Sequence, residues 1–316
     1  MKKSFFVLIG ILIFFLAACG TENEGTNDNE NQGSAENSDD ARVIEHEMGS
    51  TKIKGQPENI VALEFSYVDA LASLGISPVG IADDDDENRI IAPIKEKIGD
   101  YTSVGTRKQP SLEVISSLQP DLIIADLQRH KDIYDQLSDI APTIVLSSLS
   151  ADYEEILSSF ETVSEAVGKK EEGQEILKEH KKRMEELRAQ VPEDETRTVM
   201  PAVVTADAVY AHNFESYTGS LLESIGLKNA IQDGDDRYNK INLEQVVQFN
   251  PDVMFLMESG EQTIIDDWED KPLWQEVNAN QNDALYSVDR NMWSRFRGLI
   301  SSEKILESAI NHLYNQ

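Results

Sequence analysis

The sequence has little cysteine and little positive charge. Its 316 residues contain one cysteine, and 28 Lys and Arg residues stand against 58 Asp and Glu residues, for a formal net charge of −30. A single cysteine excludes a disulfide framework within the chain. Negative charge of this size repels phosphate backbones, so we expect no nucleic-acid partner. With 40% hydrophobic and 27% charged residues, the composition is that of a globular body rather than a membrane bundle.

Sequence motifs of catalysis and metal binding are missing as well. The chain contains no G-x-S-x-G elbow, P-loop, G-x-G-x-x-G or H-E-x-x-H, so we expect no enzyme and no cofactor. The histidines are scattered without the spacing of metal ligands, which predicts no directly coordinated zinc or copper. They are His46, His130, His180, His212 and His312. The acidic run from Asp83 to Glu87 lacks the central glycine of an EF-hand loop, and we interpret it as a solvated loop.

The N-terminus has the features of an export signal followed by an anchor. Lys2 and Lys3 precede an apolar run from Phe5 to Ala18, which is short for a membrane span and suits a signal peptide. The run ends in Leu16-Ala17-Ala18-Cys19, which resembles the lipobox of bacterial lipoproteins. We therefore expect residues 1–18 to be removed and Cys19 to carry the lipid. The alternative is a plain secretory signal with an incidental cysteine.

Residues 19–42 are expected to form a disordered acidic tether. From Gly20 to Asp40 the chain has seven acidic residues, no basic residue and no large apolar residue. Such a segment cannot bury enough apolar surface to fold. It would hold the body away from the membrane, on the extracytoplasmic face of the cell membrane.

After the tether, short apolar runs alternate with helical patterns in both halves of the chain. This alternation predicts an α/β fold with buried strands. The runs that we interpret as strands are Ile60–Leu63, Leu122–Ala125, Thr143–Leu146, Val199–Val204, Val253–Met257 and Leu285–Val288. We expect two α/β lobes, at residues 43–150 and 193–316.

The two halves also share a short sequence motif, which recurs at a constant offset of 131 residues. Leu112-Glu113, followed by Pro120-Asp121-Leu122-Ile123, recurs as Leu243-Glu244, followed by Pro251-Asp252-Val253-Met254. In each copy a helix is stopped by proline and a strand follows. The repeat indicates two similar lobes.

Residues 151–192 are expected to form a helical connection between the lobes. Apolar residues from Tyr153 to Val167 fall on one helix face, and a second helical face runs from Ile176 to Val191 after a break at Gly168. A stiff helical link of this kind permits small rocking motions rather than wide hinge closure.

Several of the eleven arginines follow predicted strand ends. They are Arg89, Arg107, Arg129, Arg295 and Arg297. Ligands of open α/β sheets bind outside the carboxyl ends of the strands. Guanidinium groups pair with carboxylates through two parallel hydrogen bonds, so we expect a small, carboxylate-rich anion. The aromatic residues Phe65, Tyr67, Tyr217 and Trp293 lie near the same loops, where they either wall a cleft or pack in the core.

From about Ile44 onward the chain resembles the substrate-binding lipoproteins of iron-siderophore and cobalamin ABC importers. Leu63 to Leu71, Gln109-Pro110-Ser111-Leu112-Glu113 and Pro120-Asp121-Leu122-Ile123 carry the general resemblance. The branch that binds ferric citrate is indicated by the acidic loop ending in Arg89, the pair Arg129-His130, the segment Tyr217-Thr218-Gly219-Ser220 and the segment Trp293-x-Arg295-x-Arg297-Gly298.

The resemblance implies a monomeric, bilobal binding protein with a rigid interlobe helix. It would capture ferric iron already chelated by citrate and deliver it to the membrane subunits of an ABC permease. The implied ligand-binding residues are Arg89, Arg107, Arg129, His130, Tyr217, Trp293, Arg295 and Arg297. The implied permease-docking residues are Glu113 and Glu223, although the internal repeat would pair Glu113 with Glu244. Another ferric chelate, hydroxamate or catecholate, is the alternative ligand, and a surface chelate hydrolase is the alternative activity.

Overall fold

The computed structural model describes residues 41–315 except 235, 259 and 261. The predicted signal peptide, Cys19 and nearly all of the predicted tether lie outside the described residues. The described residues belong to one compact unit. Within the described ranges, no helix is both long and apolar enough to cross a bilayer.

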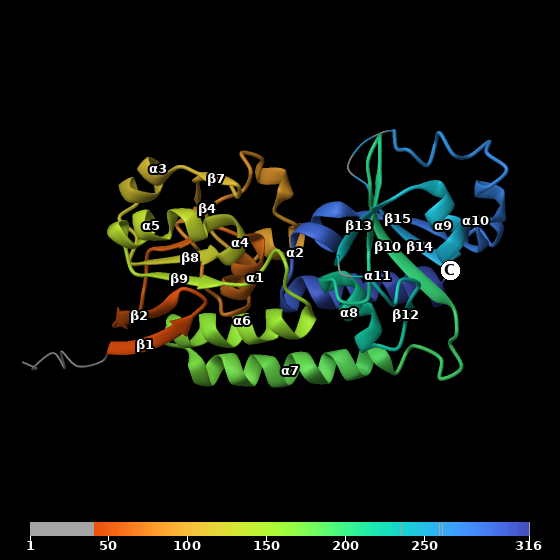
Figure 1. The fold of residues 1–316 in the computed structure, drawn as a ribbon. Coiled ribbons are helices and arrows are strands. Elements are labelled where there is room, and N and C mark those ends of the chain that lie inside the picture. The colour runs from red at the N-terminus through yellow and green to blue at the C-terminus, as the bar shows by residue number, and fades with distance from the viewer. Residues whose placement is uncertain (1–40, 235, 259, 261, 316) are drawn as a thin grey trace, which may run out of the picture. The chain divides into compact units, whose positions relative to one another are not determined.

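The first lobe is built on a parallel five-stranded sheet, in the order β5-β4-β3-β8-β9 (Figure 1). Its strands are β3 (Ile60–Ala62), β4 (Gly80–Ile81), β5 (Thr102–Ser103), β8 (Leu122–Asp126) and β9 (Thr143–Leu146). Its helices are α1 (Phe65–Ser73), α2 (Ala92–Lys95), α3 (Leu112–Ser117), α4 (Leu127–His130) and α5 (Tyr134–Ile140), with 3₁₀ turns η1 (Glu87–Arg89) and η2 (Lys131–Ile133). Two hairpins accompany them, β1 (Ala41–His46) with β2 (Gly49–Lys54) and β6 (Gly105–Thr106) with β7 (Gln109–Pro110).

The second lobe has a mixed sheet in the order β13-β11-β10-β14-β15, with β12 beside the start of β10. Its strands are β10 (Thr198–Val204), β11 (Val209–His212), β12 (Lys228–Asn229), β13 (Tyr238–Ile241), β14 (Val253–Glu258) and β15 (Leu285–Asp289). Its helices are α8 (Tyr217–Ser224), α9 (Leu243–Phe249), α10 (Asn278–Gln281) and α11 (Leu299–Tyr314), with the 3₁₀ turn η3 (Trp274–Glu276) and the π-helical turn η4 (Asn291–Arg295). All six predicted strands are present, with ends shifted by at most one residue.

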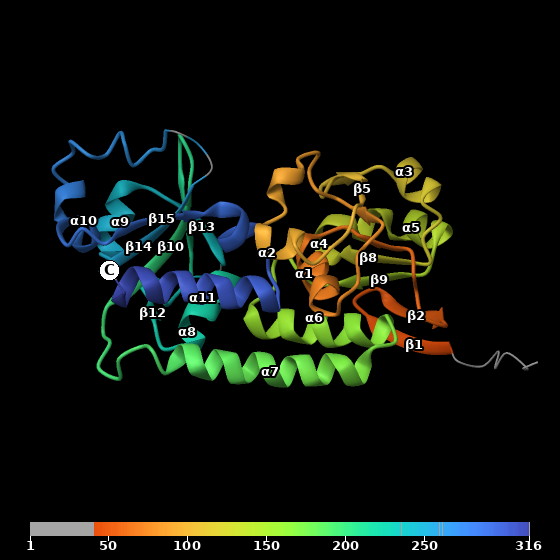
Figure 2. The same cartoon turned by 180° about the vertical axis from the view of Figure 1, so that it is seen from behind.

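Two helices connect the lobes, α6 (Tyr153–Ala166) and α7 (Lys170–Arg188). The break predicted at Gly168 is confirmed, and this glycine has the left-handed φ of 76° that lets the chain reverse between the helices. Figures 1 and 2 show α6 against the first lobe and α7 running beneath both lobes. By the rise of an α-helix, the 19 residues of α7 span roughly 28 Å. Along this length α7 contacts α6 and the C-terminal helix α11.

The internal repeat places the same structural unit in both lobes. Ser111 caps α3 and Asn242 caps α9, each by accepting a hydrogen bond from a backbone N–H in the first turn. Asp121 then accepts backbone N–H groups at the entrance to the neighbouring strand β3, and Asp252 accepts the Thr198 N–H at 2.8 Å at the start of β10. The shared motif therefore encodes a capped helix, a proline that ends this helix, and a carboxylate that aligns two parallel strands.

One apolar core extends through both lobes. Buried residues of β3 and α1 belong to the same cluster as buried residues of β14, η4 and α11. At the junction, the rings of Phe65 and Phe296 stack with centroids 4.7 Å apart and planes at 8°. Because this stack joins α1 to the segment that carries Arg295 and Arg297, packing at the junction also sets the position of those arginines.

Candidate functional site

A buried carboxylate lies between two predicted site arginines of the first lobe. Glu64 follows β3, has the extended backbone of a helix N-cap (φ −145°) and is fully buried. Its Oε2 accepts a hydrogen bond from Arg107 Nη1 at 3.3 Å, and its Oε1 forms an ion pair with Arg129 Nε. The Arg107 guanidinium also lies over the Phe65 ring, with Cζ 4.4 Å from the ring centroid. No local sequence signal distinguishes Glu64 among the 58 acidic residues.

A second carboxylate, Asp84, joins Arg107 to Arg89. Asp84 Oδ2 accepts hydrogen bonds from Arg107 Nε at 3.0 Å and Nη2 at 2.7 Å, and it pairs with Arg89 Nη1. Its Oδ1 accepts the backbone N–H of Arg107 at 2.9 Å. Burial opposes ionisation of Asp84, but the Arg107 hydrogen bonds and the nearby Arg89 charge lower its pKa to about 2.

The acidic loop from Asp83 to Glu87 is not uniformly solvated, so that expectation was wrong for two of its residues. Asp83 is only 3% exposed and accepts hydrogen bonds from the hydroxyls of Tyr101, at 3.0 Å, and Ser103. Asp84 is turned toward Arg107. The loop sequence looks solvated because the hydroxyl partners of Asp83 and the Arg107 partner of Asp84 lie about twenty residues away in the chain.

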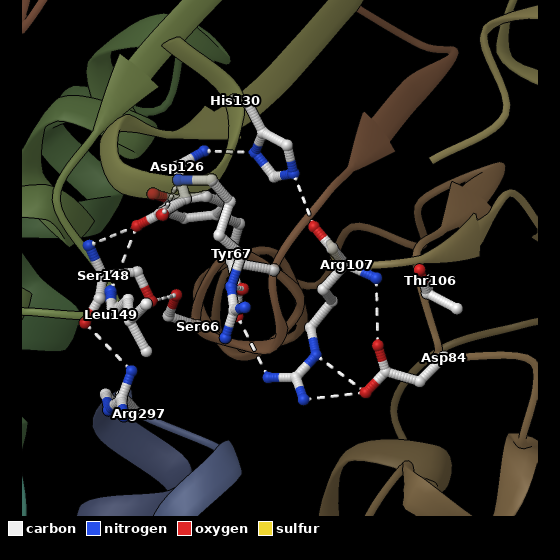
Figure 3. A network of polar contacts seen from close by, with 12 residues as sticks. Ser66, Tyr67, Asp84, Thr106, Arg107, Asp126, His130, Ser148, Leu149 and Arg297 are labelled. Atoms are coloured by element: carbon white, nitrogen blue, oxygen red, sulfur yellow. Dashed lines mark hydrogen bonds and ion pairs between the residues drawn. The ribbon is translucent and has the colours of Figure 1, made fainter. Parts of the chain in front are cut away.

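His130 is a positioning residue in this structure, not the predicted ligand contact. It is fully buried, its Nδ1 accepts the Asp126 N–H at 2.9 Å, and its Nε2 donates to the Arg107 carbonyl at 2.8 Å (Figure 3). Burial lowers the pKa of His130, in keeping with a neutral ring that accepts at one nitrogen and donates at the other. Both ring nitrogens are used to fix the backbone beside the arginines.

Asp126 links the first-lobe arginines to the junction between the lobes. One of its oxygens caps α4 by accepting the Arg129 N–H at 2.9 Å, and the other accepts the N–H groups of Ser148 at 3.0 Å and Leu149 at 3.1 Å. Across the junction, Arg297 Nη1 donates to the Ser148 carbonyl at 3.0 Å (Figure 3). A chain of direct contacts therefore runs from Arg107 through His130, Asp126 and Ser148 to Arg297.

Arg295 lies within electrostatic reach of the first-lobe arginines, and Arg297 is linked to them through Ser148. Arg295 is in η4, a π-helical turn of the kind often found at functional sites. Burial, together with the positive charges of Arg290, Arg89 and Arg107, lowers the pKa of Arg295 to about 10. No carboxylate among the described residues forms an ion pair with Arg295 or Arg297. The structure thus brings all five sequence-predicted arginines to one junction.

Tyr217 and Trp293 are core residues, so their predicted role as cleft walls was wrong. Each is about 1% exposed. The Tyr217 hydroxyl donates to the Gly298 carbonyl at 3.3 Å, and the Trp293 ring packs on Phe255 with centroids 4.8 Å apart. Tyr67 is likewise buried and donates to the Leu146 carbonyl at 2.8 Å. Of the two roles that the sequence left open for these aromatics, core packing is the observed one.

Three residues near Arg297 were not predicted from the sequence as site residues. The Tyr238 ring lies 5.9 Å from Arg297 Cζ, and the His212 ring meets it edge-on at 4.8 Å. Burial and the charges of Arg297 and Arg290 lower the pKa of His212 to about 3. Arg290 directly follows β15, so the rule that selected the other arginines also applies to it. Tyr238 and His212 are neighbours through β-sheet register, a signal that no local motif carries.

The predicted docking glutamates differ in their surroundings. Glu113 is exposed in the first turn of α3. Glu223 is half-buried, and its Oε1 accepts hydrogen bonds from the Asn229 N–H at 3.1 Å and from Gln232 Nε2. Glu244, the repeat counterpart of Glu113, is exposed in the first turn of α9. Position and exposure therefore match Glu113 with Glu244 rather than with Glu223.

Within the part of the chain that the structure describes, no group of three or more His, Cys, Asp or Glu residues is arranged to hold a metal ion. The charged groups gathered at the junction are mainly guanidinium groups, which suit an anionic ligand.

The two-lobed fold is that of a solute-binding protein. Residues 60–292 match the periplasmic binding protein family, and the chain belongs to that family. It is 44% identical over 310 residues to the Fe(3+)-citrate-binding protein YfmC of Bacillus subtilis, covering 98% of each chain. It is 38% identical to the Fe(3+) dicitrate-binding periplasmic protein FecB of Escherichia coli, covering 87% of this chain and 91% of FecB.

A solved structure has the same two-lobed fold. The structure of Staphylococcus aureus SirA complexed with staphyloferrin B superposes with a TM-score of 0.75 at 25% identity, covering 86% of this chain and 98% of SirA. The predicted fold class, two α/β lobes joined by a long rigid helix, is confirmed. The family consists of binding proteins, so the chain is a binding protein and not an enzyme.

Proposed function

We propose that this protein captures ferric citrate outside the cytoplasm and delivers it to an ABC permease for iron import. The observation that carries the proposal is the convergence of arginines from both lobes on one junction, where Arg295 and Arg297 form no ion pair with a carboxylate of the described residues. The names of YfmC and FecB support citrate as the chelator.

The electrostatics of the site favour a ligand with several negative charges. The lowered pKa of Arg295 means that its positive charge is disfavoured by burial and by neighbouring arginines. A polycarboxylate bound at the junction reverses this repulsion by supplying the missing negative charge. Hydrogen bonds to charged groups contribute about 1.5–3 kcal/mol each, so a few guanidinium contacts suffice for tight binding.

In this proposal the protein binds the chelate and not the bare ion. Citrate surrounds the iron, and the arginines bind carboxylate oxygens on the outside of the complex. The proposed contacts are Arg89, Arg129, Arg295 and Arg297. Arg107 is 8% exposed, and Glu64 and Asp84 use three of its N–H directions, so it orients the site as well.

For permease docking we propose Glu113 and Glu244 in place of the expected pair Glu113 and Glu223. Both are exposed in the first turn of a helix, and both precede the same proline-stopped strand unit. Glu223 is held by two hydrogen bonds within its own lobe. Exposed carboxylates on each lobe can meet arginines of the membrane subunits at low desolvation cost.

The membrane anchor remains the one predicted from the sequence. We propose that a lipid on Cys19 holds a monomeric binding protein at the extracytoplasmic face of the membrane, through an acidic tether that ends at residue 40, because Ala41 and Arg42 belong to β1. The lipobox-like Leu16-Ala17-Ala18-Cys19 segment supports this anchor. FecB, named as periplasmic, supports a location outside the cytoplasm.

A titration panel followed by tryptophan fluorescence tests the proposed ligand. Trp293 lies in the same turn as Arg295, η4, so occupation of the junction should change its emission. We expect saturable binding of ferric citrate and much weaker binding of iron-free citrate, of ferric hydroxamates and of ferric catecholates. Preferential binding of a hydroxamate or catecholate chelate would assign the protein to that ligand instead.

A further inference from the structure

Asp84 is the carboxylate at the centre of the arginine-rich junction. Its Oδ2 meets three guanidinium nitrogens, two from Arg107 and one from Arg89. It also acts on the second lobe, because its negative charge raises the pKa of Arg295 against the neighbouring positive charges. The position where a ligand carboxylate would be most stable is thus already close to a carboxylate of the protein.

The loop that carries Asp84 is built to hold it there. Asp84 and Asp85 both have left-handed backbones, with φ of 62° and 57°, which non-glycine residues adopt rarely. The Asp84 N–H donates to the Gly105 carbonyl at 3.2 Å, and the Asp85 N–H donates to Asp83 Oδ1 at 3.1 Å. Two successive residues in this conformation turn the Asp84 carboxylate away from solvent and toward Arg107.

The two arginines that share Asp84 are held unequally. Arg107 contacts it through two side-chain nitrogens and the backbone N–H, and the Arg107 side chain is 10% exposed. Arg89 contacts it through one nitrogen, and its side chain is 30% exposed. The pair with Arg89 is therefore the weaker one, and Arg89 is the more accessible to a ligand.

We propose that Asp84 is a specificity-determining residue that competes with the ligand for Arg89. In the structure Asp84 holds both Arg89 and Arg107. On ligand binding it keeps Arg107 and gives up Arg89 to a ligand carboxylate. This inference rests on the proposed function, since it concerns the same anion site.

The exchange favours ligands with many carboxylates. A ligand with one carboxylate replaces one ion pair by another at Arg89 and gains little from the exchange. A polycarboxylate that also reaches Arg295 and Arg297, which form no ion pair in the described chain, gains contacts that Asp84 does not offset. Asp84 therefore lowers the affinity for every anion, and a weakly charged anion has no further contacts to offset this loss.

Asp84→Asn tests the competition, with Asp85→Asn as its matched control. Both changes remove one negative charge from the same loop, and asparagine tolerates the left-handed backbone at both positions. Asp85 is exposed and forms no ion pair with an arginine of the described chain. Binding of ferric citrate is measured by titration at low and at high salt, beside the thermal unfolding of each variant.

Asp84→Asn should bind ferric citrate about two- to five-fold more tightly than wild type at low salt. A change in affinity of this size is expected when one partly exposed ion pair no longer competes with the ligand. The gain should shrink at high salt. Asp85→Asn should match wild type. Unchanged or weaker binding by Asp84→Asn, or an equal gain in Asp85→Asn, would overturn the proposal.

A crystal structure of the wild-type complex with ferric citrate keeps the proposal testable if Asp84→Asn does not fold. The contact between Asp84 and Arg89 should be broken and the contact with Arg107 kept. Retention of both contacts would overturn the competition. A wild-type protein that does not bind ferric citrate would instead refute the proposed function, which separates the two failures.

Discussion

The carboxylate of Asp69 in α1 accepts a hydrogen bond at 2.9 Å from the backbone N–H of Ser301, at the start of α11 in the other lobe. It accepts a second one from the Ile300 N–H at 3.0 Å. A buried carboxylate of the first lobe thus caps the last helix of the second lobe, and burial raises the pKa of Asp69. Because Arg297 lies just before this helix, the cap fixes the position of a proposed ligand contact.

Asp69→Ala should destabilise the protein by about 2 kcal/mol and weaken ferric citrate binding. The substitution leaves two buried N–H groups at the start of α11 without their acceptor, and it loosens the segment that carries Arg297. Urea unfolding and ligand titration measure the two effects. Asp121→Ala is the control, since Asp121 also accepts two backbone N–H groups but within one lobe. Wild-type affinity in Asp69→Ala would show that this cap does not position the site.

Gly298→Ala should cost about 1–3 kcal/mol of stability, the usual range for overpacking a tight site. A Cβ atom at this position would lie 2.3 Å from Asp69 Cγ, so Asp69 and the start of α11 would have to separate. The control is Gly99→Ala, whose Cβ would have its nearest neighbour, Ser77 Oγ, at 3.7 Å. Equal thermal unfolding temperatures for the two variants would contradict the close approach of α1 and α11.

The buried His212 should make the protein less stable as the pH falls below about 6.5. Its pKa is about 3 in the folded protein, so between these values the unfolded chain takes up a proton that the folded chain does not. The free energy of unfolding then decreases with falling pH, by at most about 1.4 kcal/mol per pH unit for this group.

His212→Phe keeps a ring against Tyr238 but cannot titrate. Its free energy of unfolding should fall less steeply than that of wild type between pH 6.5 and 4.5. Denaturant titrations across this pH range measure both slopes. Identical slopes would mean that His212 is protonated in the folded protein.

Charge removal at the proposed docking glutamates should separate delivery from ligand binding. Glu113→Ala and Glu244→Ala should each bind ferric citrate like wild type, because both side chains are exposed on helices α3 and α9. Each should stimulate the ATPase of the reconstituted permease several-fold less than wild type. Glu223→Ala is the comparison. Stimulation lost in Glu223→Ala and kept in Glu244→Ala would restore the pair expected from the resemblance.

The sequence predicted the strands and the helix break because their signals are local. Apolar runs bounded by turns mark β8 and β14, and a glycine at a helix end marks the reversal between α6 and α7. The position of the site was also predictable, since parallel strands bring their carboxyl ends, and the arginines that follow them, to one edge.

The residues that hold the arginines were not predictable, because their partners are distant in the chain. Glu64 meets Arg107 across 43 residues, and Arg297 meets Ser148 across 149. The role of the aromatic residues was not predictable from the sequence either. A buried ring and a cleft wall have the same local pattern, and only packing against Phe255 distinguishes Trp293 as core.

The affinity of an Arg295→Gln, Arg297→Gln double variant for ferric citrate tests the central claim most directly. The control is Arg183→Gln with Arg188→Gln, which removes the same charge from α7, away from the junction. If the two junction arginines hold the chelate, the first variant should bind at least about 100-fold more weakly than wild type, because two charged hydrogen bonds contribute about 3 kcal/mol or more together, and the control should bind like wild type. Ferric citrate affinity that is equal in wild type and in the junction variant would contradict the account.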